Sequence, residues 1–297
     1  MNLKLYQLLG KGSFGSVFLG DFENDQLNLK GVAIKQIPIK NTRDQNKVEK
    51  ELAFLKQAQD FDNPNNPHFV KYHVAFEKDG KFYIIMDYDE AHWKDTLSLN
   101  FSKLLQKNFS EYFNKFFMLI THLLEGLKLL HDSCIVHADI KPDNLLMHTG
   151  PNGKKVLVYS DFGLSCFKKE CIRKGTPTYM HPQMFFKGKI ASMETDIYAL
   201  ILTLYEIMFD SVFYDFEEMP EEEDYEDKFD DNMQRLKYEL DDLIKVDKRA
   251  KHILLLFQKV LDPKKPLYQI PSISGIMSFL LSGDEADLKI KDEDKCI

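Results

Sequence analysis

One eight-residue run constrains the fold of this chain more than any other feature of its sequence. Residues 137–144 read HADIKPDN and bring a carboxylate, an ammonium group and a carboxamide together at Asp139, Lys141 and Asn144. The run follows the strongest helical pattern in the chain, residues 111–131, where apolar residues recur along one face. A match at five specified positions (H, D, K, P and N) arises by chance in roughly one of ten thousand chains of this length. A functional motif is therefore a better interpretation of this run than an ordinary polar loop.

A glycine-rich stretch at residues 10–17, GKGSFGSV, predicts a loop that approaches phosphate groups. Glycines let the backbone turn sharply and bring its N–H groups close to phosphate oxygens. Taken alone, the pattern fits a plain hairpin equally well. A dinucleotide-binding fold would require a helix directly after the glycines, whereas residues 16–20 have the pattern of a strand.

Four further motifs follow along the chain. They are VAIK at residues 32–35, DFG at 161–163, GTPTYMHPQ at 175–183 and DIYA at 196–199. DFG alone is weak, but it follows Asp139 by 22 residues and comes just after the strand-like residues 155–159. Together with the glycine-rich stretch and HADIKPDN, and in this order, the motifs resemble those of the protein kinase family. The resemblance covers about residues 3–283.

The resemblance implies the α+β, bilobal protein-kinase fold, with a small antiparallel-sheet N-lobe that carries one helix and a larger, mainly helical C-lobe. We expect the N-lobe over about residues 1–87, the hinge over about 87–92, the C-lobe over about 93–283 and a charged C-terminal tail over 284–297. The residue pattern agrees, because residues 3–39 alternate like strands and the signal after Asp89 is mainly helical.

The resemblance also implies that the chain binds ATP and Mg²⁺. Lys35 is implied to grip the α- and β-phosphates and to pair with a glutamate of the helix expected over residues 44–59. Periodicity alone does not separate Glu49 from Glu51, and the family register, with an apolar residue four positions later, favours Glu51. The other residues implied to contact ATP are Leu9, Gly10, Lys11, Gly12, Ser13, Phe14, Gly15, Val17, Ala33, Met86, Asp87, Tyr88, Leu146 and Asp161. Adenine is implied to lie between Val17, Ala33 and Leu146.

The same resemblance assigns catalytic roles. Asp139 is implied to accept or orient the proton of the substrate hydroxyl, and Lys141 to neutralise charge on the transferring phosphoryl group. Asn144 and Asp161 are implied to bind Mg²⁺, which prefers oxygen ligands. Lys141 is the serine/threonine-type residue at its position, and Thr176 points the same way. We therefore expect a serine/threonine kinase that acts on protein hydroxyls, with dual specificity left open.

Ala138 stands where the family usually has an arginine. In many kinases that arginine binds a phosphate on the activation loop through two parallel hydrogen bonds, which alanine cannot do. Residues 166–175 contain no Ser, Thr or Tyr. We therefore predict activity that does not depend on phosphorylation of the activation loop.

Gln183 is a second departure, since the family has a glutamate there that pairs with an arginine near the last helices. No arginine follows Arg249, and residues 262–266 read DPKKP where the partner is expected. Loss of both partners together is compatible with a stable fold. A single charged partner left buried alone would lower the stability by about 3–5 kcal/mol. His181 and Tyr198 are milder changes of the same kind.

The net charge of −8 is concentrated in one segment. Residues 210–231 carry a charge of −11, which leaves +3 for the rest of the chain. Without a basic stripe, we expect no nucleic-acid partner. The composition of residues 215–231 favours a solvated, mobile loop. The alternative is a surface that attracts basic protein substrates.

The apolar runs near residues 197–209 and 253–257 are too short to span a bilayer, and no signal-peptide pattern is visible. We therefore expect no membrane partner and a cytoplasmic, intracellular location. The four cysteines have no paired spacing that indicates a disulfide framework or a zinc site. Reduced thiols are the expectation.

Two other classes of function stay open. A pseudokinase that serves as an ATP-binding scaffold would typically lack Lys35, Asp139 or Asp161, all of which are present. A kinase of small molecules fits less well, because residues 161–183 resemble a segment that seats a peptide. The protein substrate, the kinase subfamily, any activating partner and the oligomeric state cannot be read from the sequence.

Overall fold

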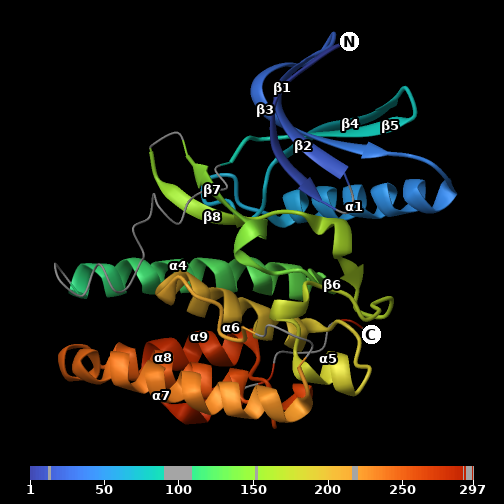
Figure 1. The fold of residues 1–297 in the computed structure, drawn as a ribbon. Coiled ribbons are helices and arrows are strands. Elements are labelled where there is room, and N and C mark those ends of the chain that lie inside the picture. Colours follow the sequence, from blue (N-terminus) through green and yellow to red (C-terminus); the bar gives the residue numbers. More distant parts are fainter. Residues whose placement is uncertain are drawn as a thin grey trace. The chain divides into compact units, whose positions relative to one another are not determined.

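Alternating apolar residues at the N-terminus form a five-stranded antiparallel sheet (Figure 1). The strands are β1 (Asn2–Gly12), β2 (Gly15–Glu23), β3 (Asn28–Pro38), β4 (Tyr72–Lys78) and β5 (Lys81–Met86), in the spatial order β1-β2-β3-β5-β4. A turn at Asp79 and Gly80, both with positive φ, joins β4 to β5. The sheet contributes a core of Phe22, Val32, Ile34, Tyr83 and Ile85.

The computed structural model describes residues 1–12, 15–89, 109–150, 153–215, 220–289, 291 and 296. These residues form two units: the described parts of Met1–Trp93 with Leu145–Gly163, and the described parts of Lys94–Asn144 with Leu164–Ile297. β7 (Leu145–Thr149) and β8 (Lys155–Tyr159) belong to the first unit, although the expected C-lobe included them. The reason is that Tyr159 donates its N–H to His68 and accepts one from Val70, at 2.7 and 2.9 Å. The expected lobe boundaries stay a prediction.

α1 (Thr42–Phe61) is the helix expected over residues 44–59. The side chain of Asn41 accepts the N–H of Asp44 at 3.0 Å and so begins the helix. Its buried stripe consists of Val48, Glu51, Phe54, Leu55 and Ala58. Leu52 is only half-buried.

The second unit is mainly helical (Figure 1). Its helices are α4 (Phe109–Asp132), α5 (Pro182–Phe186), α6 (Met193–Phe209), α7 (Glu222–Val246), α8 (Arg249–Leu261) and α9 (Ile273–Ser282). α6 is buried along nearly its whole length, as its apolar sequence predicts, and begins with a capping box formed by Ser192 and Thr195. α6 packs against α8, and α4 and α8 pack against α9. Part of the expected charged tail, Glu285–Lys289, forms a 3-10 helix. The predicted α+β fold class is confirmed.

The acidic segment corrects one expectation. Residues 222–231 form the first turns of α7 and not a loop. Tyr225, Leu236 and Leu240 on this helix are buried, so an apolar stripe anchors it despite the charge. Acidic residues in a first turn also stabilise a helix through its dipole.

The cysteines correct a second expectation. All four are paired, Cys134 with Cys296 and Cys166 with Cys171, where reduced thiols were expected. Sequence spacing missed both pairs, because the fold brings the partners together.

Among the described residues, no helix combines the length and the apolar character that a membrane span requires. The cytoplasmic location stays a prediction.

Candidate active site

Lys35 binds two carboxylates in the first unit. It lies on β3, and its Nζ atom donates to Glu51 of α1 at 2.5 Å and to Asp161 at 2.9 Å. Lys35 and Glu51 are buried, whereas the side chain of Asp161 is 41% exposed. Glu49, the alternative partner, is exposed and accepts from Gln45 at 3.1 Å instead. The geometry therefore pairs Lys35 with Glu51.

Burial and neighbouring charge shift the pKa values of Lys35 and Glu51 in opposite directions. Burial alone would lower the pKa of Lys35, but the carboxylates of Glu51 and Asp161 outweigh burial and raise that pKa above its ordinary value. Burial raises the pKa of the Glu51 carboxyl, and Lys35 opposes this rise. Lys35 therefore stays cationic, which suits it to bind phosphate oxygens.

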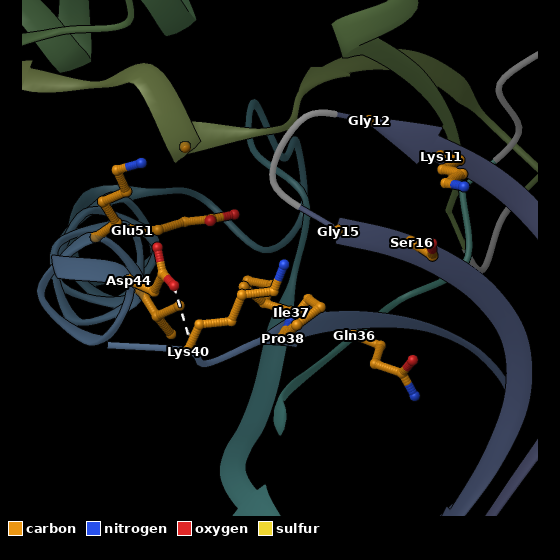
Figure 2. A pocket seen from close by; sticks show the side chains of 13 residues that line it. Lys11, Gly12, Gly15, Ser16, Gln36, Ile37, Pro38, Lys40, Asp44 and Glu51 are labelled. Atoms are coloured by element: carbon orange, nitrogen blue, oxygen red, sulfur yellow. Dashed lines mark hydrogen bonds between the residues drawn. The ribbon is translucent and has the colours of Figure 1, made fainter. Parts of the chain in front are cut away.

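The glycine-rich stretch joins β1 to β2, and a pocket of about 330 Å³ lies between it, the end of β3 and α1 (Figure 2). Gly15 has a φ of +152°, and a Cβ atom there would lie 2.3 Å from the carbonyl oxygen of Gln36. A side chain at this position would clash with β3, so the close approach requires glycine. The pocket is lined by Lys11, Gly12, Gly15, Ser16, Gln36, Ile37, Pro38, Lys40, Asp44, Lys47, Val48, Glu51 and Gly163. Ser13 and Phe14 lie outside the described residues.

Strand register places several predicted ATP contacts on one face of the sheet. Val17 of β2 is paired with Lys35, and Ala33 is paired with Met86 of β5. Alternate residues of a strand point to the same side, so Ala33 and Lys35 share a face with these partners. Gly10 lies opposite Val17 on β1. The register thus gives one continuous surface from the glycine-rich stretch to the end of β5.

The predicted hinge continues from β5. The Asp87 carboxylate contacts His73 at 2.6 Å, and residues 90–92 lie outside the described part of the chain. Of the remaining predicted contacts, Leu9 on β1 and Leu146 on β7 are half-buried, and Tyr88 is exposed.

In the second unit, the carboxylate of Asp139 lies at the centre of a hydrogen-bond cluster. Its Oδ1 accepts the N–H and the hydroxyl of Thr176, at 3.0 and 2.6 Å. Its Oδ2 accepts from Asn144 at 2.9 Å and lies 3.0 Å from the Nζ of Lys141. Lys141 also donates to the Thr176 hydroxyl at 2.8 Å. The structure thus brings Asp139, Lys141 and Asn144 together, and these bonds fix the orientation of the carboxylate.

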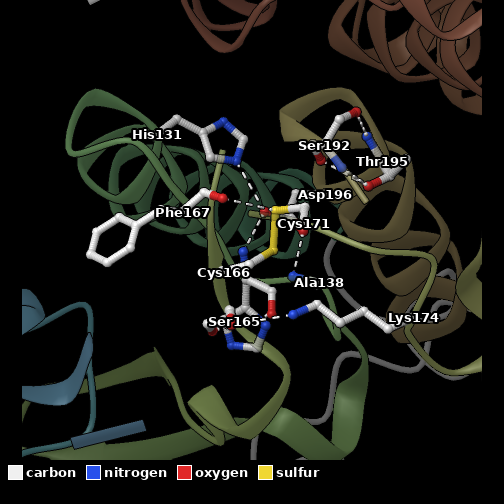
Figure 3. Close-up of a disulfide and its surroundings, with 11 residues drawn as sticks. His131, Ala138, Ser165, Cys166, Phe167, Cys171, Lys174, Ser192, Thr195 and Asp196 are labelled. Atoms are coloured by element: carbon white, nitrogen blue, oxygen red, sulfur yellow. Dashed lines mark hydrogen bonds and ion pairs between the residues drawn. A yellow bond between two sulfur atoms is a disulfide. The ribbon is translucent and has the colours of Figure 1, made fainter. Parts of the chain in front are cut away.

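Asp196, at the start of α6, holds the backbone of this cluster (Figure 3). Its two carboxylate oxygens accept the N–H groups of His137 and Ala138, at 2.7 and 2.8 Å. The ring of His131 lies 3.1 Å from the same carboxylate. Ala138 has a φ of +65°, a conformation uncommon for a residue other than glycine. A fully buried carboxylate therefore holds the backbone directly before Asp139.

A known protein family matches most of the chain, including parts of both units. The family model of the protein kinase domain matches residues 3–267. The chain belongs to the protein kinase family. The predicted family is thereby confirmed, while the individual roles of its site residues stay proposals.

Curated relatives of this kinase domain are named as protein kinases, and two of the three described next are named as serine/threonine kinases. The chain is 30% identical over 74% of its length to the serine/threonine-protein kinase nekl-2 of Caenorhabditis elegans. It is 30% identical over 69% of its length to a probable cell cycle serine/threonine-protein kinase, the CDC5 homolog of Encephalitozoon cuniculi (strain GB-M1). It is 32% identical over 67% of its length to the mitogen-activated protein kinase kinase kinase 5 of Homo sapiens. The matches span 60%, 41% and 14% of these relatives, so the chain corresponds to a part of each.

The residues that depart from the family pattern make specific contacts in the folded kinase domain. The side-chain oxygen of the buried Gln183 accepts the N–H of Leu267 at 3.4 Å, just beyond the DPKKP run. A neutral hydrogen bond therefore lies at Gln183, where the family pattern has an ion pair. The ring of His181 packs edge-on against Tyr198, with 4.7 Å between the ring centroids. The two milder changes are thus in contact.

The buried His181 makes the folded kinase domain sensitive to acid. Its Nδ1 accepts the N–H of Gln183 at 3.1 Å, and its Nε2 has no hydrogen-bond partner among the described residues. Burial, together with the nearby charge of Lys187, lowers the pKa of His181 to about 4. Between about pH 6.5 and pH 4, the unfolded chain therefore binds a proton that the folded chain does not. The free energy of unfolding falls as the pH drops through this window.

We expect His181→Ala to reduce this sensitivity. Between pH 7 and pH 5, the free energy of unfolding should fall by about 2 kcal/mol more for the wild type than for the variant. Urea denaturation of both proteins at each pH measures the difference. Comparing the change with pH within each protein removes the constant cost of the smaller side chain. Equal losses in the two proteins would contradict the expectation.

Tyr179 and Glu206 form a contact that the sequence analysis did not predict. The hydroxyl of Tyr179 donates to the carboxylate of Glu206 on α6. Burial raises the pKa of this hydroxyl, and Glu206 raises it further, so the group keeps its proton as a donor. Tyr179 is part of a recognised motif, but no local pattern connects it with a residue of α6. The contact ties the segment after Thr176 to the buried helix.

Proposed function

We propose that this chain is an ATP- and Mg²⁺-dependent serine/threonine kinase of proteins. The observation that carries the proposal is the cluster in which Asp139, Lys141 and Thr176 lie within hydrogen-bond distance of one another. A positioned carboxylate next to an ammonium group suits the transfer of a phosphoryl group to a hydroxyl. Lys141 and Thr176 are also the residues on which the serine/threonine assignment depends.

In the proposed reaction, a serine or threonine hydroxyl oxygen attacks the γ-phosphorus of ATP. The bond from this phosphorus to the bridging oxygen breaks, and ADP leaves. Asp139 accepts the proton of the hydroxyl, and Lys141 neutralises negative charge on the transferring group. Lys35, held cationic by its two carboxylates, binds the α- and β-phosphates.

The donor set suits a nucleotide with its metal ion. Gly10, Gly12 and Gly15 carry no side chain that would keep a phosphate chain away from the backbone N–H groups. We propose the carboxylate of Asp161 and the side-chain oxygen of Asn144 as magnesium ligands, because Mg²⁺ prefers oxygen. When bound, Mg²⁺ neutralises negative charge on the phosphates.

We propose basic proteins as the favoured substrates. Residues 221–224, at the start of α7, are all acidic and exposed. Two lysines pair with this region, Lys187 with Glu222 at 3.1 Å and Lys264 with Glu226 at 3.0 Å. These pairs compensate only part of the negative charge of residues 210–231, so an attraction for cationic peptides follows.

Transfer of the γ-phosphate to a general basic protein tests this function. The full chain is incubated with Mg²⁺ and ATP, and mass spectrometry locates the phosphate. Phosphoserine or phosphothreonine is the expected product, and an acidic protein of similar size should accept less phosphate at low salt. Phosphotyrosine alone would contradict the serine/threonine assignment. No transfer, with a melting temperature that Mg²⁺ATP still raises, would favour the scaffold alternative.

We further propose that activity does not require phosphorylation of the activation loop. Ala138 offers no charge to bind a phosphate, and residues 166–175 contain no acceptor hydroxyl. Phosphatase treatment of the purified chain should leave kcat within about twofold of its original value. If treatment abolished activity, and rephosphorylation of that loop restored it, the proposal would be wrong.

A further inference from the structure

A disulfide lies within the segment that connects DFG to Thr176 (Figure 3). Cys166 is on the short strand β9 (Cys166–Phe167), which pairs with β6 (Ile135–Val136) directly before the Asp139 cluster. Cys171 follows five residues later, and its Sγ atom also lies 3.3 Å from the carbonyl oxygen of Phe167. The bond therefore closes a six-residue loop against the backbone that carries the cluster.

The disulfide packs into one apolar cluster with residues from both sides of the Asp139–Thr176 contact. The cluster consists of Val136, Ala138, Cys166, Cys171, Met180, Met184 and Ala191. Ala138 precedes Asp139, and Met180 follows Thr176 by four residues. Gly175 passes so close that a Cβ atom there would lie 2.9 Å from the carbonyl oxygen of Ala138. A shift of Cys171 would therefore disturb the packing that seats Thr176 on Asp139.

We propose that Cys166 and Cys171 form a redox-controlled modification site, at which the disulfide holds Thr176 against Asp139 and a dithiol reductant releases it. The inference rests on the proposed kinase function. Hydrogen bonds and the packing of the apolar cluster are the remaining restraints on this segment once the bond is broken. A covalent link removes conformations that the open loop would otherwise sample.

The chemistry of the loop suits thiol–disulfide exchange. Residues 166–174 carry four cationic side chains and one anionic side chain, and nearby cations stabilise a cysteine thiolate. Lys174 is held beside the loop, where its Nζ donates to the carbonyl oxygen of Ser165 at 3.3 Å. Cys166 and Cys171 are only 5% and 6% exposed, so exchange requires the loop to open locally.

The exchange balances in both directions. A thiolate of the dithiol attacks one cysteine sulfur, the bond between Cys166 and Cys171 breaks, and a mixed disulfide forms. The second thiol of the reductant displaces the cysteine, so the chain gains two electrons and two protons as two thiols, and the reductant becomes a cyclic disulfide. In the reverse direction, glutathione disulfide takes up the two electrons and leaves as two glutathione thiols.

The test compares the full chain after treatment with dithiothreitol and with glutathione disulfide. Alkylation with mass spectrometry reports the state of each cysteine, and γ-phosphate transfer reports activity. We expect reduction to lower kcat/KM on the order of tenfold, and glutathione disulfide to restore it. Cys171→Ser should stay at the low level under both treatments. Cys296→Ser, which removes only the other disulfide, should respond as the wild type does.

Hydrogen exchange gives a second readout that needs no catalysis. The N–H of Lys168 donates to the carbonyl oxygen of Cys134, and that of Glu170 to Phe167, at 2.9 and 2.7 Å. Both should exchange faster after reduction, in the wild type and in Cys296→Ser. No transfer in any redox state would count against the kinase function alone. Unchanged exchange or unchanged activity after reduction of Cys166 and Cys171 would overturn the inference, as would free thiols at both positions in the oxidised sample.

Discussion

Asp139→Asn is expected to lower kcat about 10³-fold while leaving the protein folded. The substitution keeps the volume of the side chain but replaces an oxygen that accepts hydrogen bonds with an amide nitrogen that donates them. Asp139 accepts from Thr176 and Asn144 and lies beside Lys141, so the amide would face donors on both sides. It also could not take up the proton of the substrate hydroxyl. Single-turnover transfer measures the effect on chemistry.

Asp143→Asn is the matched control for this experiment. Asp143 lies in the same run and is exposed, and it takes no part in the Asp139 cluster described above. Its substitution removes the same charge and should change kcat by less than about threefold. A kcat for Asp139→Asn within tenfold of the wild type would contradict the catalytic role of Asp139.

Lys35→Met is expected to lower the free energy of unfolding by about 3–5 kcal/mol. The reason is that Glu51, with 5% of its side chain exposed, would become a buried carboxylate without its cation. Asp161 is 41% exposed and can turn to water, so it adds less to the cost. Urea denaturation measures the loss. Phosphoryl transfer should fall as well, because the phosphates lose their cationic ligand.

A double variant separates stability from activity at this pair. Lys35→Met with Glu51→Leu replaces the buried ion pair by apolar side chains and should recover most of the lost stability, without any recovery of transfer. Lys30→Met is the matched control, because Lys30 is 61% exposed and pairs with Asp21 at the surface. That change should cost less than about 1 kcal/mol. A double variant as unstable as Lys35→Met would contradict the account.

Local patterns in the sequence account for the elements whose causes are local. The turn at Asp79 and Gly80, the helix over residues 44–59 and the buried helix over 197–209 follow from turn residues and apolar spacing. The choice between Glu49 and Glu51 was different, because both lie on one helix and only the family register separated them. In the structure, the burial of Glu51 beside Lys35 reflects tertiary packing.

The features that sequence reasoning missed depend on contacts between distant segments. Composition suggested a loop at residues 215–231, since acidic residues outnumber the apolar ones that anchor α7. Cys166 and Cys171 are close in sequence, but their pairing depends on how β9 meets β6. Cys134 and Cys296 are separated by 162 residues, and no spacing rule connects them. The bond from Leu267 to Gln183 likewise requires the folded second unit.

The most direct test of the central claim is transfer of the γ-phosphate of ATP by the full chain, with Asp139→Asn measured in parallel. The account predicts Mg²⁺-dependent transfer to serine or threonine of a basic protein, lost in the variant although both proteins unfold at similar temperatures. Transfer that persists in the variant, or a folded wild type that binds Mg²⁺ATP and transfers nothing in either redox state of Cys166 and Cys171, would contradict it.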